Sequence, residues 1–240
     1  NHMNYLELRR MAICDEAPKN TASRMLKVMG LLIKKKFPES KSNYVVVPNG
    51  VDSNIFNMET LDRNNEFEKF EGCILCVARI EGLKCQLNLV RAMRGLPWKL
   101  VLAGKPAPNH IRYYQKILRE AGPNIFFLGQ ITHEKLPGLY KAARVHCLVS
   151  WMETTGLSSL EAGAMGCNLV VTDRGDTREY FKGHAFYCEP DSVSSIRNAI
   201  VKAYNAPFNK ELKEIIREKY SWNSAAKKTL QAYRFAAQHI

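Results

Sequence analysis

Two carboxylates eight positions apart form the chemically most informative pattern in this sequence. Glu153 lies in a polar turn after an apolar stretch, and Glu161 lies in the helical pattern that follows. Because helical side chains lean towards the N-terminus of their helix, Glu161 can reach the space above Gly156. The free N–H groups at the start of that helix suit a phosphate or a sugar hydroxyl. The pattern indicates two carboxylates that accept hydrogen bonds from a polyol beside a bound anion.

Each of these residues also has a simpler explanation. Glu161 taken alone is an early-helix carboxylate that the helix dipole stabilises, and for the isolated residue we favour that explanation. Glu153 taken alone could be a loop acid without a role. Arg79 and Lys84 follow another apolar stretch, and each taken singly is equally well explained as an exposed cation on a basic protein. The surrounding motifs, described below, weigh against these explanations.

Short apolar segments alternate with amphipathic ones from residue 72 onwards, which predicts parallel strands connected by helices. We expect an α/β fold: a Rossmann-like, doubly wound parallel sheet of about six strands with extra C-terminal helices. The expected strands are Cys73–Ala78, Trp98–Ala103, Ile125–Leu128, Val145–Val149, Asn168–Thr172 and Ala185–Cys188. The expected helices are Lys84–Arg94, Asn109–Ala121, His133–Ala143, Gly156–Met165, Thr177–Phe181, Val193–Ala203 and a helical region from Lys210.

Ligands of such sheets bind at the carboxyl ends of the strands, near the point where the strand order reverses. Polar residues and glycines do follow the expected strands, at Arg79, Gly104, Gly129, Gln130, Ser150 to Gly156 and Asp173 to Asp176. Any single strand-to-helix turn needs glycine and capping residues as well. The prediction of a site therefore depends on the set and not on one turn.

The first 43 residues follow a different pattern. Residues 1–3 resemble a cloning remnant, and residues 4–43 contain helical patterns and a basic run without alternating strands. We expect residues 1–43 to be this remnant and a helical lead-in left from an N-terminal region. Residues 44–240 then form one Rossmann-like domain, which begins with a short strand at Tyr44–Val47.

Composition narrows the classes of function. With 46% hydrophobic and 24% charged residues the chain is neither disordered nor collagen-like, and no apolar run approaches the roughly 20 residues of a membrane span. The net charge of +12 favours phosphates, nucleic acid or anionic lipid as partners. Seven cysteines spread through apolar segments indicate a reducing compartment, and hence a cytoplasmic protein. Cys73 and Cys76 would point to opposite faces of a strand, and no histidine spacing or D-x-D motif indicates a metal site.

A series of motifs in a fixed order resembles the family 4 glycosyltransferases, the large retaining group with the GT-B fold. Segment 153–161 resembles the E-x7-E motif of that family, and the resemblance runs from about residue 44 to 235. The other matching stretches are Val47 to Asp52 with Phe56, Val77-Ala78-Arg79 with Lys84, Leu102-Ala103-Gly104, Phe127 to Ile131, Leu139-Tyr140 before Ala142, and Tyr220-Ser221-Trp222. Agreement in order is far more specific than any one motif.

The resemblance implies a role for each matching residue. Arg79 and Lys84 would grip the diphosphate of a nucleotide-sugar donor while the glycosidic bond breaks, and Glu153 would contact the transferred sugar; these three form the expected catalytic set. Glu161 would bind the ribose hydroxyls. The remaining expected binding residues are Thr155, Gly156, Leu157 and Ser158 beside phosphate and sugar, Gly129, Gln130 and Ile131 beside the base, and Gly104.

The same resemblance implies the partners. The donor would be a UDP- or GDP-linked sugar bound without a metal, since cationic side chains replace it. The acceptor would bind to an N-terminal domain that this chain has no room for, so that the chain alone would be inactive. A non-catalytic nucleotide-sugar-binding module and a sugar-nucleotide epimerase on the same scaffold remain alternatives. Nucleic acid is not expected, because the sequence has no basic stripe rich in aromatic residues.

The basic N-terminal residues leave two explanations open. Lys34 to Lys36, together with Arg9, Arg10, Lys19 and Lys27, could hold the protein peripherally against an anionic membrane or could form a solvated basic face.

The sequence departs from the family pattern at a few positions. Thr154 and Thr155 replace the usual glycine and aromatic residue after the first glutamate, which weakens any inference about the sugar. Cys85 stands where glycine commonly follows the lysine, and Asn168 stands where proline is common. The turn at Gly175 keeps its glycine but carries additional charge.

Overall fold

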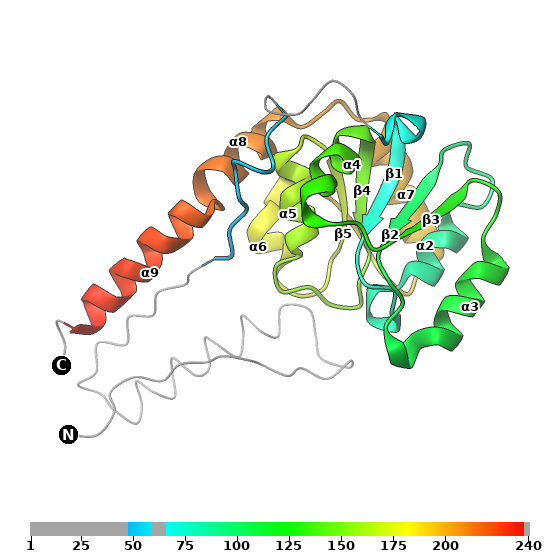
Figure 1. Cartoon of the computed structure of the whole chain (residues 1–240), viewed down its shortest axis with the longest axis horizontal. Coiled ribbons are helices and arrows are strands. Elements are labelled where there is room, and N and C mark those ends of the chain that lie inside the picture. The colour runs from blue at the N-terminus through cyan, green and yellow to red at the C-terminus, as the bar shows by residue number, and fades with distance from the viewer. Residues whose placement is uncertain (1–47, 59–65, 238–240) are drawn as a thin grey trace.

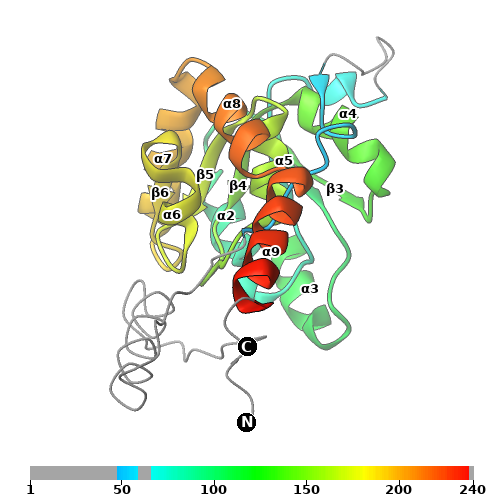
Figure 2. The same cartoon turned by 90° about the vertical axis from the view of Figure 1, so that its left-hand side faces the viewer.

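A computed structural model describes residues 48–58 and 66–237, and a six-stranded sheet forms the centre of this part of the chain (Figure 1). All neighbouring strands are parallel, and their order is β3-β2-β1-β4-β5-β6, with β3 and β6 at the two edges (Figure 2). The strands are β1 (Cys73–Val77), β2 (Leu100–Ala103), β3 (Ile125–Gly129), β4 (Ala143–Leu148), β5 (Asn168–Thr172) and β6 (Phe186–Cys188). The predicted doubly wound, Rossmann-like fold is confirmed.

Helices cover both faces of the sheet, so the inner strands β1, β2, β4 and β5 are largely buried and their alternate residues point to opposite sides. One hydrophobic cluster contains Cys73 and Leu75 of β1, and the other contains Ile74 and Cys76. The helices are α2 (Gln86–Ala92), α3 (Ile111–Glu120), α4 (Leu136–Ala142), α5 (Leu157–Ala164), α6 (Thr177–Phe181), α7 (Val193–Asn205), α8 (Lys210–Lys219) and α9 (Trp222–Ala237). Residues of α2, α3 and α7 pack in one cluster, and residues of α4, α5 and α8 pack in the other. The opposite orientation of Cys73 and Cys76 is as predicted.

Several predicted boundaries were wrong, each for a local reason. The helix expected from Lys84 begins at Gln86, because Cys85 adopts a left-handed conformation with φ 54°. The strand expected from Trp98 begins at Leu100, and the Trp98 ring stacks on Tyr204 with centroids 3.9 Å apart. Other expected helices open with a 3₁₀ turn, as at η4 (Pro108–His110) and η5 (His133–Lys135).

The residues before β1 and after α8 lie side by side. Val51 N–H donates to the Tyr220 carbonyl at 2.7 Å, and Trp222 N–H donates to the Val51 carbonyl at 3.3 Å. Beyond this pairing α9 leads away from the sheet (Figure 1). The helical lead-in, the strand expected at Tyr44–Val47 and the basic residues up to Lys36 lie outside the described residues, so these predictions stay predictions.

The strand order reverses between β1 and β4, which places the loops that follow these two strands at the same point of the carboxyl edge. The predicted cationic pair follows β1 and the first glutamate follows β4. Within the described ranges, no helix combines the length and the apolar character that a membrane span requires.

Candidate functional site

A lysine, a serine and a glutamate meet where the strand order reverses. Lys84 Nζ lies 2.5 Å from Glu153 Oε1, and Ser150 Oγ donates to the same oxygen at 2.5 Å. Trp151 N–H donates to the Leu83 carbonyl at 2.8 Å, which joins the loop after β1 to the loop after β4. Glu153 is buried, and its charge is compensated by an ammonium and a hydroxyl. The structure therefore brings two of the three predicted catalytic residues into direct contact.

The backbone of Glu153 is held by the turn that follows β5. Its N–H donates to the Arg174 carbonyl at 3.2 Å, and its carbonyl accepts from Asp176 N–H at 2.9 Å. Gly175 has φ 89°, and a Cβ built there would lie 2.0 Å from the Glu153 carbonyl oxygen. Only glycine permits both this conformation and this approach, which explains why the sequence keeps a glycine in this turn.

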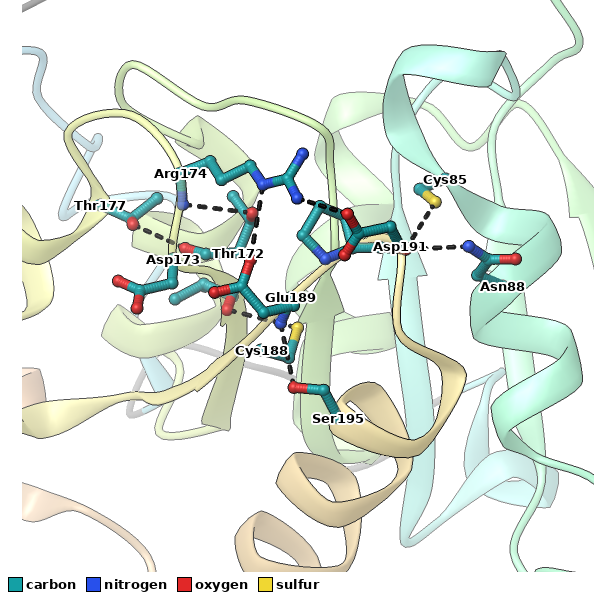
Figure 3. Close-up of polar contacts among 12 residues, drawn as sticks. Cys85, Asn88, Thr172, Asp173, Arg174, Thr177, Cys188, Glu189, Asp191 and Ser195 are labelled. Carbon is teal, nitrogen blue, oxygen red and sulfur yellow. Dashed lines mark hydrogen bonds and ion pairs between the residues drawn. The ribbon is translucent and has the colours of Figure 1, made fainter. Parts of the chain in front are cut away.

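The side chain of Arg174 connects the turn after β5 with the loop after β6 (Figure 3). Its Nη2 lies 2.7 Å from Asp191 Oδ2, and its Nε lies 3.5 Å from Glu189 Oε2. The guanidinium also covers the Trp151 ring, 4.9 Å from the ring centroid. The loops after β4, β5 and β6 are thus tied together on one side of the site.

The second glutamate, Glu161, projects from α5. Tyr140 of α4 donates its hydroxyl proton to Glu161 Oε2 at 2.8 Å, and His133 Nε2 lies 3.8 Å from Glu161 Oε1. Burial raises the pKa of Glu161, and the hydrogen bond from Tyr140 acts in the opposite direction. The carboxylate keeps 16% side-chain exposure, so a ligand hydroxyl can still reach it.

Arg79 has a looser place in the structure. It follows β1 as predicted, but its side chain is 67% exposed and its Nε lies 3.5 Å from Glu81 Oε2. Its carbonyl accepts a hydrogen bond from Gln86 Nε2 at 2.8 Å, which fixes the backbone beneath the exposed guanidinium. The described contacts of Arg79 do not include Lys84 or Glu153, so a clamp formed with Lys84 stays a prediction.

Gly104 has a packing role. A Cβ at this position would lie 1.9 Å from the Ala78 carbonyl oxygen, and Gly104 N–H already donates to the Gly129 carbonyl at 2.7 Å. The glycine closes the carboxyl ends of β1, β2 and β3 against one another. Gln130, which follows Gly129, is exposed, while Ile131 packs against the core. Their place beside the base of a nucleotide stays a prediction.

The start of α5 offers backbone rather than side chains. Gly156 precedes the helix and supplies no capping side chain, while Leu157 is exposed. Thr155 is buried, and its hydroxyl accepts from Asn49 Nδ2 at 2.8 Å and donates to Tyr180 Oη at 3.3 Å. The Thr155 hydroxyl, considered as a ligand contact from the sequence, is therefore engaged within the protein. Ser158 is half-buried on the first turn of α5.

Sequence reasoning missed three supporting residues: Ser150, Tyr140 and Asn49. Tyr140 carried a detectable signal, because a tyrosine on the apolar side of a helix needs a partner for its hydroxyl. Ser150 lies only three residues before Glu153, within the polar stretch noted from the sequence, but that spacing alone does not indicate the hydrogen bond. The contact of Asn49 with Thr155 carried no signal, since it joins segments 106 residues apart.

A model of the family described as glycosyl transferases group 1 matches residues 57–222, which include all the site residues described above except Asn49. The chain belongs to the glycosyl transferases group 1 family. An uncharacterized glycosyltransferase of Methanocaldococcus jannaschii is 29% identical over 181 residues, covering 70% of this chain and 46% of the relative. The chain spans about half the length of the curated relatives it matches.

Solved structures of glycosyl transferases group 1 and related proteins share the fold. The C-terminal domain of a glycosyl transferase group 1 family protein from Francisella tularensis aligns with a TM-score of 0.56 and 21% identity, covering 77% of this chain and 98% of that one. The Anabaena protein HepE, solved in complex with UDP, aligns with a TM-score of 0.68 and 18% identity over 80% of this chain and 57% of that one. The likeness to a C-terminal domain agrees with the predicted half of a GT-B fold.

Proposed function

We propose that this glycosyl transferases group 1 chain is the donor-binding half of a retaining glycosyltransferase. It binds a nucleotide-diphosphate sugar, and transfer takes place to an acceptor held by a second domain that faces the carboxyl edge of the sheet. The observation that carries the proposal is the meeting of Lys84, Ser150 and Glu153 at the point of strand reversal, beside the start of α5. The family and the UDP-bound structure of HepE support a nucleotide ligand.

Each candidate residue would contact a different part of the nucleotide-sugar donor. The exposed guanidinium of Arg79 and the ammonium of Lys84 would face the diphosphate and stabilise the charge that develops on the leaving group, without a metal ion. The ion pair with Glu153 already holds the Lys84 ammonium in one orientation. The carboxylate of Glu153 would accept a hydroxyl of the transferred sugar, and Glu161 would accept the ribose hydroxyls. The uncapped N–H groups at the start of α5 would bind phosphate oxygens.

Calorimetric titration of the chain with UDP, GDP and ADP tests the proposal. We expect saturable binding of UDP or GDP and clear weakening in Arg79→Ala and Glu161→Ala. Arg112→Ala is the matched control, because it removes an exposed cation from α3, on the other side of the sheet from α5. Absence of binding to all three nucleotides, or equal weakening by the control, would contradict a donor site at this edge.

Incubation with a donor sugar and no acceptor tests the reaction type. A transferase half leaves the sugar unchanged under these conditions, whereas an epimerase on the same scaffold would isomerise it. Adding the partner domain in trans or by fusion is then expected to give transfer with retained configuration at the anomeric carbon, which NMR of the product detects.

A further inference from the structure

Tyr140 is completely buried, yet its hydroxyl reaches one of the two proposed ligand-binding carboxylates. The ring makes edge contacts with Phe56, with centroids 5.9 Å apart, and with His146, with centroids 5.8 Å apart. The Tyr140 carbonyl accepts a hydrogen bond from Cys167 Sγ at 3.2 Å. Because a close-packed ring has little freedom, the position of its hydroxyl is fixed by the core.

The hydroxyl donates to Glu161 Oε2 at 2.8 Å. Glu161 stands on a different helix and has a long side chain that would otherwise populate several rotamers. A hydrogen bond to a carboxylate is stronger than one between neutral groups, so a single donor can hold the carboxylate in one orientation. The other oxygen, Oε1, is then on the side of the partly exposed His133.

The contact between Tyr140 and Glu161 is poorly explained as a contribution to the stability of the fold. Burial of Glu161 disfavours its charged form, and a phenylalanine with an apolar partner would fill the same space without polar groups. A buried donor that fixes a destabilising carboxylate is typical of a binding site that is organised before its ligand arrives.

We infer that Tyr140 is a positioning residue for nucleotide recognition: its buried hydroxyl orients the Glu161 carboxylate to accept hydrogen bonds from the ribose hydroxyls. The inference rests on the proposed function. It also assigns α4 a second role, since the helix that follows the predicted base-flanking residues Gly129 to Ile131 would also set the ribose contact.

The test compares ligands that differ only in the group that Glu161 would hold. Wild-type chain and Tyr140→Phe are titrated with the nucleoside diphosphate that the wild type binds best among UDP, GDP and ADP, with its 2′,3′-dideoxy analogue, and with inorganic pyrophosphate. Loss of the orienting hydrogen bond should weaken the ribonucleotide roughly tenfold. Binding of the dideoxy analogue and of pyrophosphate should not change.

Two further variants separate positioning from general loosening of the fold. Tyr113→Phe is the matched control, because the Tyr113 hydroxyl accepts from Leu87 N–H at 3.0 Å in the other hydrophobic cluster; it should bind like the wild type. Tyr140→Phe combined with Glu161→Gln should bind no more weakly than Glu161→Gln alone, since the two residues act through one contact.

Ribonucleotide binding by Tyr140→Phe at wild-type strength, or equal weakening of all three ligands, would overturn the inference while the proposed function stood. Absence of ribonucleotide binding by the wild type would overturn the proposed function and the inference together. If Tyr140→Phe fails to fold, Glu161→Asp gives the second measurement. The aspartate side chain is one methylene shorter, so its carboxylate lies farther from the Tyr140 hydroxyl. The expected result is a loss confined to the ribonucleotide, and wild-type binding by Glu161→Asp would overturn the inference.

Discussion

Glu161 is a residue whose proposed role conflicts with the stability of the fold. Burial raises its pKa above the usual value, so the folded chain holds the charged form at a disadvantage. When the pKa of an acid is higher in the folded chain than in the unfolded chain, its titration favours the folded state at low pH. This contribution to the free energy of unfolding is complete below the unfolded-state pKa and is lost as the pH rises through the folded-state pKa. At neutral pH the carboxylate therefore destabilises the protein.

Glu161→Gln should consequently raise the free energy of unfolding at pH 7, and the gain should shrink as the pH falls through the raised folded pKa and be absent below about 4, where both chains are neutral at this position. Urea unfolding at several pH values measures this. Glu120→Gln is the control of opposite sign, because the hydrogen bond from Arg91 lowers the pKa of Glu120. Its loss of stability should be present at neutral pH and vanish in acid; a loss of the same sign in Glu161→Gln would contradict the argument.

Cys85 explains a departure from the family pattern at the scale of one residue. It occupies a left-handed conformation with φ 54°, where glycine is the favoured residue, and its Sγ donates to the Pro190 carbonyl at 3.2 Å. A side chain in this region is strained by roughly 1–2 kcal/mol. The buried thiol offsets part of that strain through its contact and its packing.

Cys85→Ala should therefore be less stable than Cys85→Gly, since alanine keeps the strain and loses the sulfur contact, while glycine removes the strain. We expect a difference of about 1 kcal/mol in urea unfolding. At a position with ordinary helix-flanking backbone angles, the alanine variant would be the more stable of the two. If Cys85→Ala proves more stable than Cys85→Gly, the backbone of Cys85 is not strained.

At the scale of elements, the turn after β5 fixes the position of the loop after β4 through backbone hydrogen bonds to Glu153. Gly175→Ala would place a methyl 2.0 Å from the Glu153 carbonyl oxygen, whereas Gly166, also at positive φ, has open space around it. Both substitutions should cost about 1 kcal/mol in backbone strain. Gly175→Ala should cost roughly 2 kcal/mol more and should also weaken nucleotide-sugar binding, because Glu153 moves.

Chemical unfolding and donor titration of the two variants measure these effects side by side. Equal stabilities, or donor binding by Gly175→Ala at the level of Gly166→Ala, would show that the loop after β4 keeps its position without this turn.

The elements also show what the sequence could predict. Alternation of apolar and amphipathic segments located the six strands, and it placed the loops after β1 and β4 at one edge, because a buried parallel sheet has a strong pattern. Boundaries failed at Cys85, whose left-handed backbone has no pattern, and at Trp98, whose ring packs on Tyr204. The sequence named Lys84 and Glu153 as candidates, but their contact depends on how two loops meet.

At the scale of the whole molecule, the segments before β1 and after α8 are paired and reach the proposed site together. Asn49 Nδ2 donates to Thr155 Oγ1 at 2.8 Å, and the neighbouring Val51 pairs with Ser221. The Tyr180 ring, whose hydroxyl accepts from Thr155, lies 5.1 Å from the Tyr220 ring between centroids. The loop that begins α5 is thus linked to both segments.

Gly50 is the residue on which this pairing depends. A Cβ at Gly50 would lie 2.5 Å from Trp222 N and 2.6 Å from the Ser221 carbonyl carbon, which are backbone atoms that a rotamer change cannot move away. Gly50→Ala should therefore separate the two segments and lower the free energy of unfolding by roughly 1–3 kcal/mol. Gly183→Ala is the matched control, because the same methyl there meets open space, and it should change stability by less than about 0.5 kcal/mol.

Hydrogen exchange shows how far the effect extends. If the paired segments form one unit with the sheet, Gly50→Ala should accelerate exchange at the amides of Val51 and Trp222 and in α8, whose Leu212 and Ile216 lie in the same hydrophobic cluster as Val51. Acceleration confined to α9, with α8 and the overall stability unchanged, would mean that the pairing is a surface attachment. In that case the link through Asn49 could not transmit a displacement of these segments to the proposed donor site.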